Sequence, residues 1–239
     1  MLKTVHVSAP TQDLRAPGLA DPRTEIWTRH GIQGQGTAPP WIAGQYAGKS
    51  LMIIGCGRNV WEDLTHYPRY QYGPMQKPYD PMVYHAFDVM AINEIGMYLP
   101  HVDHWVSMHD DVLRHLSEIR KQLGLAETML HSNTPLRPDT HCACCGGMVY
   151  WHLAAALGCS GLLAVHIAVL LGYEAILLAG IPADNHGNFY HPATMGGTHG
   201  VVRAKERWEA AIRRVPAIAQ RVRSLSGWTR ELLGAPDGV

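Results

Sequence analysis

The sequence predicts an α/β fold built on a doubly wound, mostly parallel sheet. Short apolar runs of strand length alternate along the chain with stretches of helix length. A long apolar helix and the strand after it are separated by only a few residues, the tight connection that is common in parallel sheets. The composition, 46% hydrophobic and 17% charged, is that of a globular protein with a buried core.

The chain divides into an irregular arm, residues 1–47, and a single α/β domain, residues 48–239. The arm is rich in proline and glycine and has no sustained hydrophobic period, apart from one short helix expected near Glu25. Such an arm either packs on the domain or mediates assembly, so a homo-oligomer is one expected state. The remaining length suits one large domain with a well-buried core.

The first part of the domain predicts four strands. Residues 50–54 are a short apolar run ended by Gly55, the pattern of a strand buried on both faces. Asn59 is placed to cap the next helix, whose first turn carries acidic residues that the helix dipole favours. The proline-rich residues 66–81 predict a loop. Strands are also expected at 87–93 and 104–109, a helical turn at 94–99, a helix at 111–123 and a short strand at 128–131.

The second part contains the clearest helix and strand. Residues 161–171 form the most apolar helix, which ends at Gly172, and a buried strand follows at 175–180. This segment is too interrupted by polar residues and glycine to span a bilayer. Residues 203–223 are helical, with a break or kink at Pro216, and the last residues are expected to be a tail.

Charge and cysteine usage restrict the location and the partners. Lys plus Arg and Asp plus Glu number 20 each, so nothing indicates electrostatic capture of nucleic acid or of an anionic membrane. The first ten residues lack the apolar run of a signal peptide. Five cysteines, three of them at Cys142, Cys144 and Cys145, do not make a disulfide framework. We therefore expect a cytoplasmic protein with no nucleic-acid partner and no membrane span.

No metal site is predicted. Cys142 and Cys145 satisfy the C-x-x-C spacing beside His141, but a structural zinc site normally takes its remaining ligands from a second such pair, which the chain lacks. His101, His104 and His109 stand at odd and even offsets around one strand, so they do not share a face.

The run 55–59, Gly-Cys-Gly-Arg-Asn, is the first candidate for ligand binding. It follows a buried strand and opens a helix, where backbone N–H groups and the helix dipole favour an anion. Glycine lets a phosphate approach the backbone, and Arg58 would add a charge-assisted hydrogen bond. The run has Val60 in place of the third glycine of a dinucleotide fingerprint and lacks the Lys-Ser/Thr pair of a P-loop. The run therefore predicts either a phosphate-binding turn or a plain strand-to-helix turn.

Two further candidates follow later strands. Asn93 ends the second strand, where open α/β sheets bind ligands, although it would equally serve to cap the next helix. The loop 180–191 brings together an aspartate, two histidines and a tyrosine at the same edge. His186 or His191 would serve as a general base near neutral pH, with Tyr190 beside them. The alternative is a polar loop with incidental histidines, since the chain has 15 of them.

The order of these motifs resembles a known superfamily. The series is Gly-x-Gly-Arg-Asn after a buried strand, Asp-Val-Met-Ala-Ile-Asn at 88–93, Val-Asp-His-Trp-Val-Ser at 102–107, and a Ser-Gly helix leading into Leu-Gly-Tyr-x-x-Ile-x-Leu-x-Gly at 171–180. Over residues 49–191 it is similar to the superfamily that holds the bacterial CMP-sialic-acid sialyltransferases and the DUF115, or 6-hydroxymethylpterin diphosphokinase MptE-like, proteins. Similar proteins are found among tailed-phage genes, so a phage-encoded protein in the host cytoplasm is one expected origin.

The resemblance implies a Rossmann-like sheet that holds a nucleotide at three places: the first turn, the asparagine after the second strand and the Ser-Gly of the late helix. The family's usual first turn reads Gly-x-Gly-Pro-Ser-Leu, whereas residues 58–60 here are Arg-Asn-Val. The sialyltransferases use a histidine base beyond the late strand and tyrosines near the leaving phosphate, which corresponds by region to His186, His191 and Tyr190. The nucleotide-binding positions carried over are Gly55, Gly57, Arg58, Asn59, Asn93, Ser160 and Gly161.

Three functions are therefore considered. The first is a nucleotide-sugar-dependent glycosyltransferase-like enzyme in which a histidine deprotonates an acceptor hydroxyl; the nucleotide sugar is its substrate, and no other cofactor is required. The second is an MptE-like diphosphokinase that uses ATP and Mg²⁺, with Asp110, Asp111 and Asp184 as metal ligands. The third is a non-catalytic, phage-type interaction protein that retains the fold.

Overall fold

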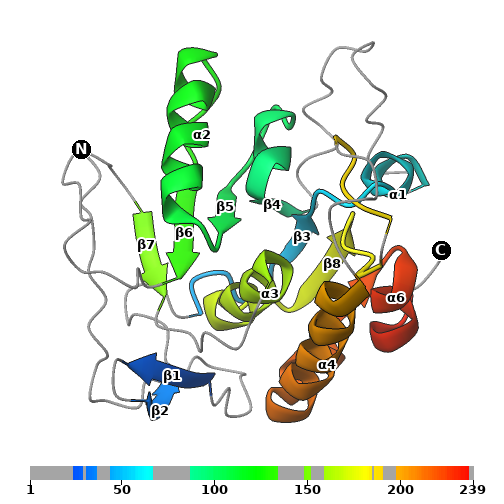
Figure 1. Ribbon diagram of the computed structural model, residues 1–239. Helices are drawn as coiled ribbons and strands as arrows, with labels where there is room; N and C mark the ends of the chain where they lie inside the picture. The colour runs from blue at the N-terminus through cyan, green and yellow to red at the C-terminus, as the bar shows by residue number, and fades with distance from the viewer. Residues whose placement is uncertain are drawn as a thin grey trace.

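The computed structural model describes residues 24–28, 31–36, 44–66, 87–133, 148–151, 159–184, 186–190 and 198–236. Within these residues, seven strands form one sheet in the order β7-β6-β5-β4-β3-β8-β9, and every neighbouring pair is parallel (Figure 1). Helices connect the strands and cover both faces. The predicted doubly wound α/β fold is confirmed. The strands of the sheet are β3 (Ser50–Ile54), β4 (Asp88–Ile92), β5 (His104–Ser107), β6 (Met129–Asn133), β7 (Met148–Trp151), β8 (Ala175–Ala179) and β9 (Val222–Ser224).

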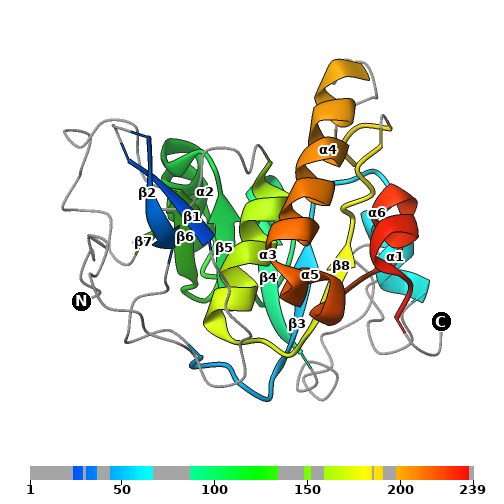
Figure 2. The ribbon, with the colours of Figure 1, turned by 90° about the horizontal axis from the view of Figure 1, so that it is seen from below.

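Each face of the sheet packs a separate apolar core against its helices. On one face, the side chains of β3 and β8 pack against α3, which is buried along nearly its whole length because all its core residues are apolar except His166. Figure 2 shows α3, α4 and α5 together on this side. The opposite face packs against α1, η2 and α2. The helices are α1 (Val60–His66), the 3₁₀ helix η2 (Asn93–Met97), α2 (Asp110–Gln122), α3 (Ser160–Leu171), α4 (Thr198–Arg214), α5 (Pro216–Arg221) and α6 (Gly227–Leu233).

Three sequence predictions are wrong. The short helix near Glu25 is a strand: β1 (Thr24–Thr28), whose Thr, Ile and Trp residues favour strands, pairs antiparallel with β2 (Gly31–Gly36) in the arm. The strand expected over 104–109 ends at Ser107, and β7, for which no strand is predicted, forms the edge of the sheet. The expected tail contains β9 and α6, which are too short to give a periodic signal. The break at Pro216 is confirmed, since α4 ends before it and α5 begins at it.

The strand order places a topological switch point between β3 and β8. From β3 the chain adds β4, β5, β6 and β7 on one side, then returns through α3 to add β8 and β9 on the other. The connections that follow β3 and β8 therefore leave the sheet toward opposite faces, and open α/β sheets bind their ligands at this position, beyond the carboxyl ends of the strands.

Candidate functional site

The β3–α1 turn packs directly on the chain that follows β8. The amide of Gly55 donates to the carbonyl of Ala179 at 2.8 Å, and that of Gly57 donates to the carbonyl of Gly180 at 2.8 Å. A Cβ added to Gly57 would lie 2.6 Å from the Gly180 oxygen and 2.5 Å from Cδ of Pro182. These glycines are thus required by the contact between two loops of the protein itself.

A short segment, residues 186–190, lies across the same turn and is called the strap below. The amide of Arg58 donates to the carbonyl of Gly187 at 3.1 Å, and the amide of Phe189 donates to the carbonyl of Cys56 at 2.9 Å. Between these bonds Asn188 forms an antiparallel bridge with Gly57. Three of the amides expected to receive a phosphate, those of Gly55, Gly57 and Arg58, therefore donate to carbonyls of the chain.

Asn59 does not cap α1, contrary to prediction. Its Nδ2 donates to both carboxylate oxygens of Asp63 at 3.3 Å and contacts Oγ of Ser226, while its Oδ1 is buried without a hydrogen-bond partner. Asp63, 5% exposed, also accepts from the amide of Gly180 at 2.7 Å and from Oγ of Ser226 at 2.7 Å. This carboxylate joins the connections after β3, β8 and β9. In the sequence it looked like an ordinary acidic residue of a first helical turn.

Asn93 has the most unusual backbone conformation among the candidates. Its φ of 54° lies in the left-handed region, and its side-chain Oδ1 is buried with no hydrogen-bond partner among the described residues. The backbone is held there because its carbonyl accepts from Nε1 of Trp105 at 2.6 Å. Ile92 pairs with Val106, so Asn93 follows β4 at the edge where Ser107 ends β5. Strained residues of this kind gather at functional sites.

Ser160 and Gly161 open α3 at the same edge. Oγ of Ser160 accepts from the amide of Met108 at 3.3 Å, just beyond β5. A Cβ on Gly161 would lie 3.2 Å from Cγ2 of Ile181, just beyond β8. The cap is Cys159, whose Sγ accepts from the amide of Leu162 at 3.4 Å. The N-terminus of the 12-residue α3, with its partial positive charge, therefore lies among the carboxyl ends of the central strands.

Tyr190 and Cys56 meet at Glu94. Oη of Tyr190 donates to Oε2 of Glu94 at 2.8 Å, and the Cys56 thiol donates to the carbonyl of Ile92 at 3.2 Å, with Oε2 of Glu94 3.8 Å away. Burial raises the pKa of Cys56 to about 12, so its thiol remains protonated and is a poor nucleophile. Burial, and then the bond to Glu94, raise the pKa of Tyr190, so its hydroxyl is a hydrogen-bond donor.

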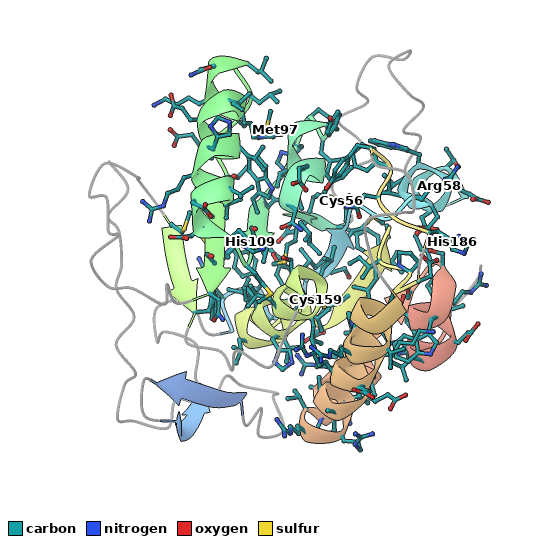
Figure 3. The ribbon with its side chains drawn as sticks, viewed as in Figure 1. Cys56, Arg58, Met97, His109, Cys159 and His186 are labelled. Atoms are coloured by element: carbon teal, nitrogen blue, oxygen red, sulfur yellow. The ribbon has the colours of Figure 1, made fainter. Side chains whose placement is uncertain are left out.

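The histidines are divided between two parts of this edge. His186 is exposed in the strap, and in Figure 3 it lies with Arg58 beside α1 and α6, away from Cys159. His191, like Cys142, Cys144 and Cys145, lies outside the described residues. His109, which we had assigned to a strand, is exposed just beyond β5; its amide donates to Oγ of Ser107 at 3.0 Å. Its place at the end of a predicted strand was the sequence signal that it could lie at the ligand-binding edge of the sheet.

The proposed metal ligands of a diphosphokinase are not brought together. Asp110 pairs with Arg114 at 3.5 Å in the first turns of α2, and Asp184 accepts from the amide of His186 at 3.0 Å beyond β8. In the part of the chain that the structure describes, no group of three or more histidine, cysteine or acidic side chains is arranged to hold a metal ion.

No protein-family model matches the chain, and no curated protein matches it either. None of the described helices has the length and apolar character needed to cross a membrane.

Proposed function

We propose that the protein binds a nucleotide at the carboxyl edge of the sheet and acts as a nucleotide-sugar-dependent, glycosyltransferase-like enzyme. The observation that carries the proposal is Asn93, held in a left-handed conformation beyond β4 with its amide oxygen buried and unpaired. An unpaired buried acceptor costs roughly 1–3 kcal/mol, and a left-handed backbone costs a similar amount. A ribose hydroxyl or a base amino group would satisfy that oxygen.

The phosphate of the ligand is assigned to the N-terminus of α3. The amides of the β3–α1 turn donate to the chain's own carbonyls, whereas Ser160 and Gly161 stand in the first turn of a helix whose dipole favours an anion. This assignment retains Asn93, Ser160 and Gly161 among the nucleotide-binding positions that the resemblance implies. It gives Gly55 and Gly57 a packing role that positions the switch point.

In the proposed reaction the acceptor hydroxyl oxygen forms a bond to the anomeric carbon of the donor sugar. The bond between that carbon and the phosphate oxygen breaks, and the phosphate leaves with the electron pair, its charge stabilised by α3. The acceptor proton passes to a histidine. His186 and His109 are both exposed at this edge, and His191 is the third candidate.

Calorimetric titration with CMP, UDP and their sugars tests the binding. We expect one of these ligands to bind, and Asn93→Ala to weaken it about tenfold, the effect of one lost hydrogen bond. Gln122→Ala, which removes an exposed amide at the end of α2, is the control and leaves affinity unchanged. Absence of binding at millimolar concentration would overturn the proposal. Strictly Mg²⁺-dependent ATP turnover would favour the diphosphokinase, and binding without transfer would favour a non-catalytic protein.

A further inference from the structure

The strap is bonded to the first turn in the manner of an added strand. The Gly187 carbonyl accepts from the amide of Arg58, and the Phe189 amide donates to the carbonyl of Cys56, on either side of the Gly57–Asn188 bridge. It is not a member of the seven-stranded sheet. Its backbone thus occupies the amide of Arg58, the residue that would otherwise offer an anion both an N–H and a guanidinium.

Two side chains anchor the strap at its far end. The Phe189 ring makes edge contacts with Trp61, centroids 5.6 Å apart, and with Tyr98, 5.2 Å apart. Tyr98 is itself 56% exposed, so this anchor lies at the surface. The next residue, Tyr190, is held by its hydrogen bond to Glu94.

The backbone at the N-terminal end of the strap is strained or adaptable. Ala183 has a φ of 49°, in the left-handed region that is costly for a residue with a Cβ, and Gly187 has a φ of 76°. Such positions relax or rotate at little cost when a segment moves. His186 and Asn188, on either side of Gly187, are exposed and contribute little burial to the closed arrangement.

We propose that the strap is a removable cover of the β3–α1 turn. It is released when Phe189 leaves Trp61 and Tyr98 and when Tyr190 leaves Glu94. Opening frees the amide of Arg58 and exposes the thiol of Cys56, a residue that is 8% exposed when the strap is closed. The proposal goes beyond the proposed function, which assigns the ligand phosphate to α3: a further anionic group that takes the amide of Arg58 and the closed strap exclude each other. The opening itself does not depend on what the ligand is.

The test is alkylation of Cys56 by iodoacetamide at mildly alkaline pH, followed peptide by peptide by mass spectrometry on the full chain. Cys159, the cap of α3, is an internal reference because it packs against the core on the face of the sheet opposite to Phe189 and Tyr190. We expect Tyr190→Phe, which removes only the hydroxyl, to speed labelling of Cys56 about tenfold, the factor that corresponds to one hydrogen bond to a carboxylate. Phe189→Ala is expected to act in the same direction, with Cys159 unchanged.

Two results would overturn the cover. One is a Cys56 rate in Tyr190→Phe equal to that of the unaltered protein. The other is an equal rise at Cys56 and Cys159, which indicates general loosening. Tyr190→Phe keeps the ring and is expected to fold even where Phe189→Ala does not.

The ligand arm uses CMP, UDP and pyrophosphate. A ligand bound at Arg58 is expected to speed labelling of Cys56. If the ligand covers the thiol itself, the strap variants are instead expected to bind it more tightly than the unaltered protein does. A ligand whose binding is weakened by Arg58→Ala, but which gives neither effect, contradicts the exclusion. If none binds, the proposed function fails while the cysteine result on the cover still stands.

Discussion

Nδ1 of His104 and Nε2 of His131 lie 3.0 Å apart in the interior, and their neighbours determine which of them carries the proton. Oη of Tyr173 donates to Oδ2 of Asp88 at 2.7 Å, so Nε2 of His104 must donate to Tyr173 at 2.9 Å. Nδ1 of His104 is then the acceptor from His131, whose own Nδ1 accepts from Nε1 of Trp151 at 3.0 Å. Both rings are neutral, each in one tautomer, and an added proton breaks a bond.

Acid should therefore destabilise the protein below about pH 6.5. Burial lowers the pKa of His104 and of His166 to about 4, and that of His131 well below its ordinary value of 6.5. A base whose folded pKa is depressed contributes stability that is fully present above the unfolded pKa and is lost as the pH falls toward the folded one. At pH 5 each fully shifted histidine would cost roughly 2 kcal/mol.

Urea unfolding at pH 7.5 and pH 5 measures this loss, and His186→Gln, at an exposed histidine, should leave the difference unchanged. Equal stability at the two pH values would contradict the neutral state assigned to these buried histidines.

Asp63 should be among the most sensitive positions for stability. Asp63→Ala leaves the buried amide of Gly180 and the hydroxyl of Ser226 without their acceptor, so we expect a loss of about 2–4 kcal/mol in the free energy of unfolding. Glu62→Ala, at the exposed neighbouring position, is the matched control and should change it by less than about 0.5 kcal/mol. Comparable effects of the two substitutions in urea unfolding would show that the three connections are held together by other contacts.

Gly57→Ala tests the packing role of the first turn. The new methyl group would overlap the Gly180 carbonyl and Pro182, and we expect a destabilisation of about 3 kcal/mol or more, the upper end for overpacking, because one overlapping group is backbone. Gly124→Ala is the control, because the space around Gly124 is open and its φ of 72° adds only the cost of a left-handed alanine, about 1–2 kcal/mol. A Gly57→Ala protein as stable as the Gly124→Ala protein would mean that the two loops separate easily.

Asn93→Gly should separate stability from binding. Glycine adopts a φ of 54° without strain, and the change removes an unpaired buried oxygen, so we expect a gain of about 1 kcal/mol in thermal or urea unfolding. Nucleotide affinity should fall, because the acceptor is lost. A variant that loses stability would indicate that the Asn93 side chain supports the fold.

The elements that the sequence predicts well are those whose own residues carry the signal. β3, β8 and α3 are continuous apolar runs ended by glycine, and the edge at which they place Asn93 and Ser160 follows from the parallel order. β9 has only three residues and pairs with β8 through contacts far away in sequence, so no local period reports it.

The roles of the candidate residues were harder to predict than their positions. A Gly-x-Gly after a strand suits a phosphate or a close neighbour equally well, and only the position of Gly180 and Pro182 identifies the neighbour. Likewise, two partners of Asp63, Gly180 and Ser226, lie more than a hundred residues away along the chain.

The return of β8 to the side of β3 has a consequence for biosynthesis. As the chain leaves the ribosome, β3 can pair with β4 early, but its other edge stays open until residues 175–179 have emerged. An unpaired apolar edge in a nascent chain is prone to misassociation, and such long-range parallel pairing is slow. The centre of the sheet is thus among the last parts to close. Asp63 receives the Ser226 hydroxyl only after a further 163 residues have been synthesised.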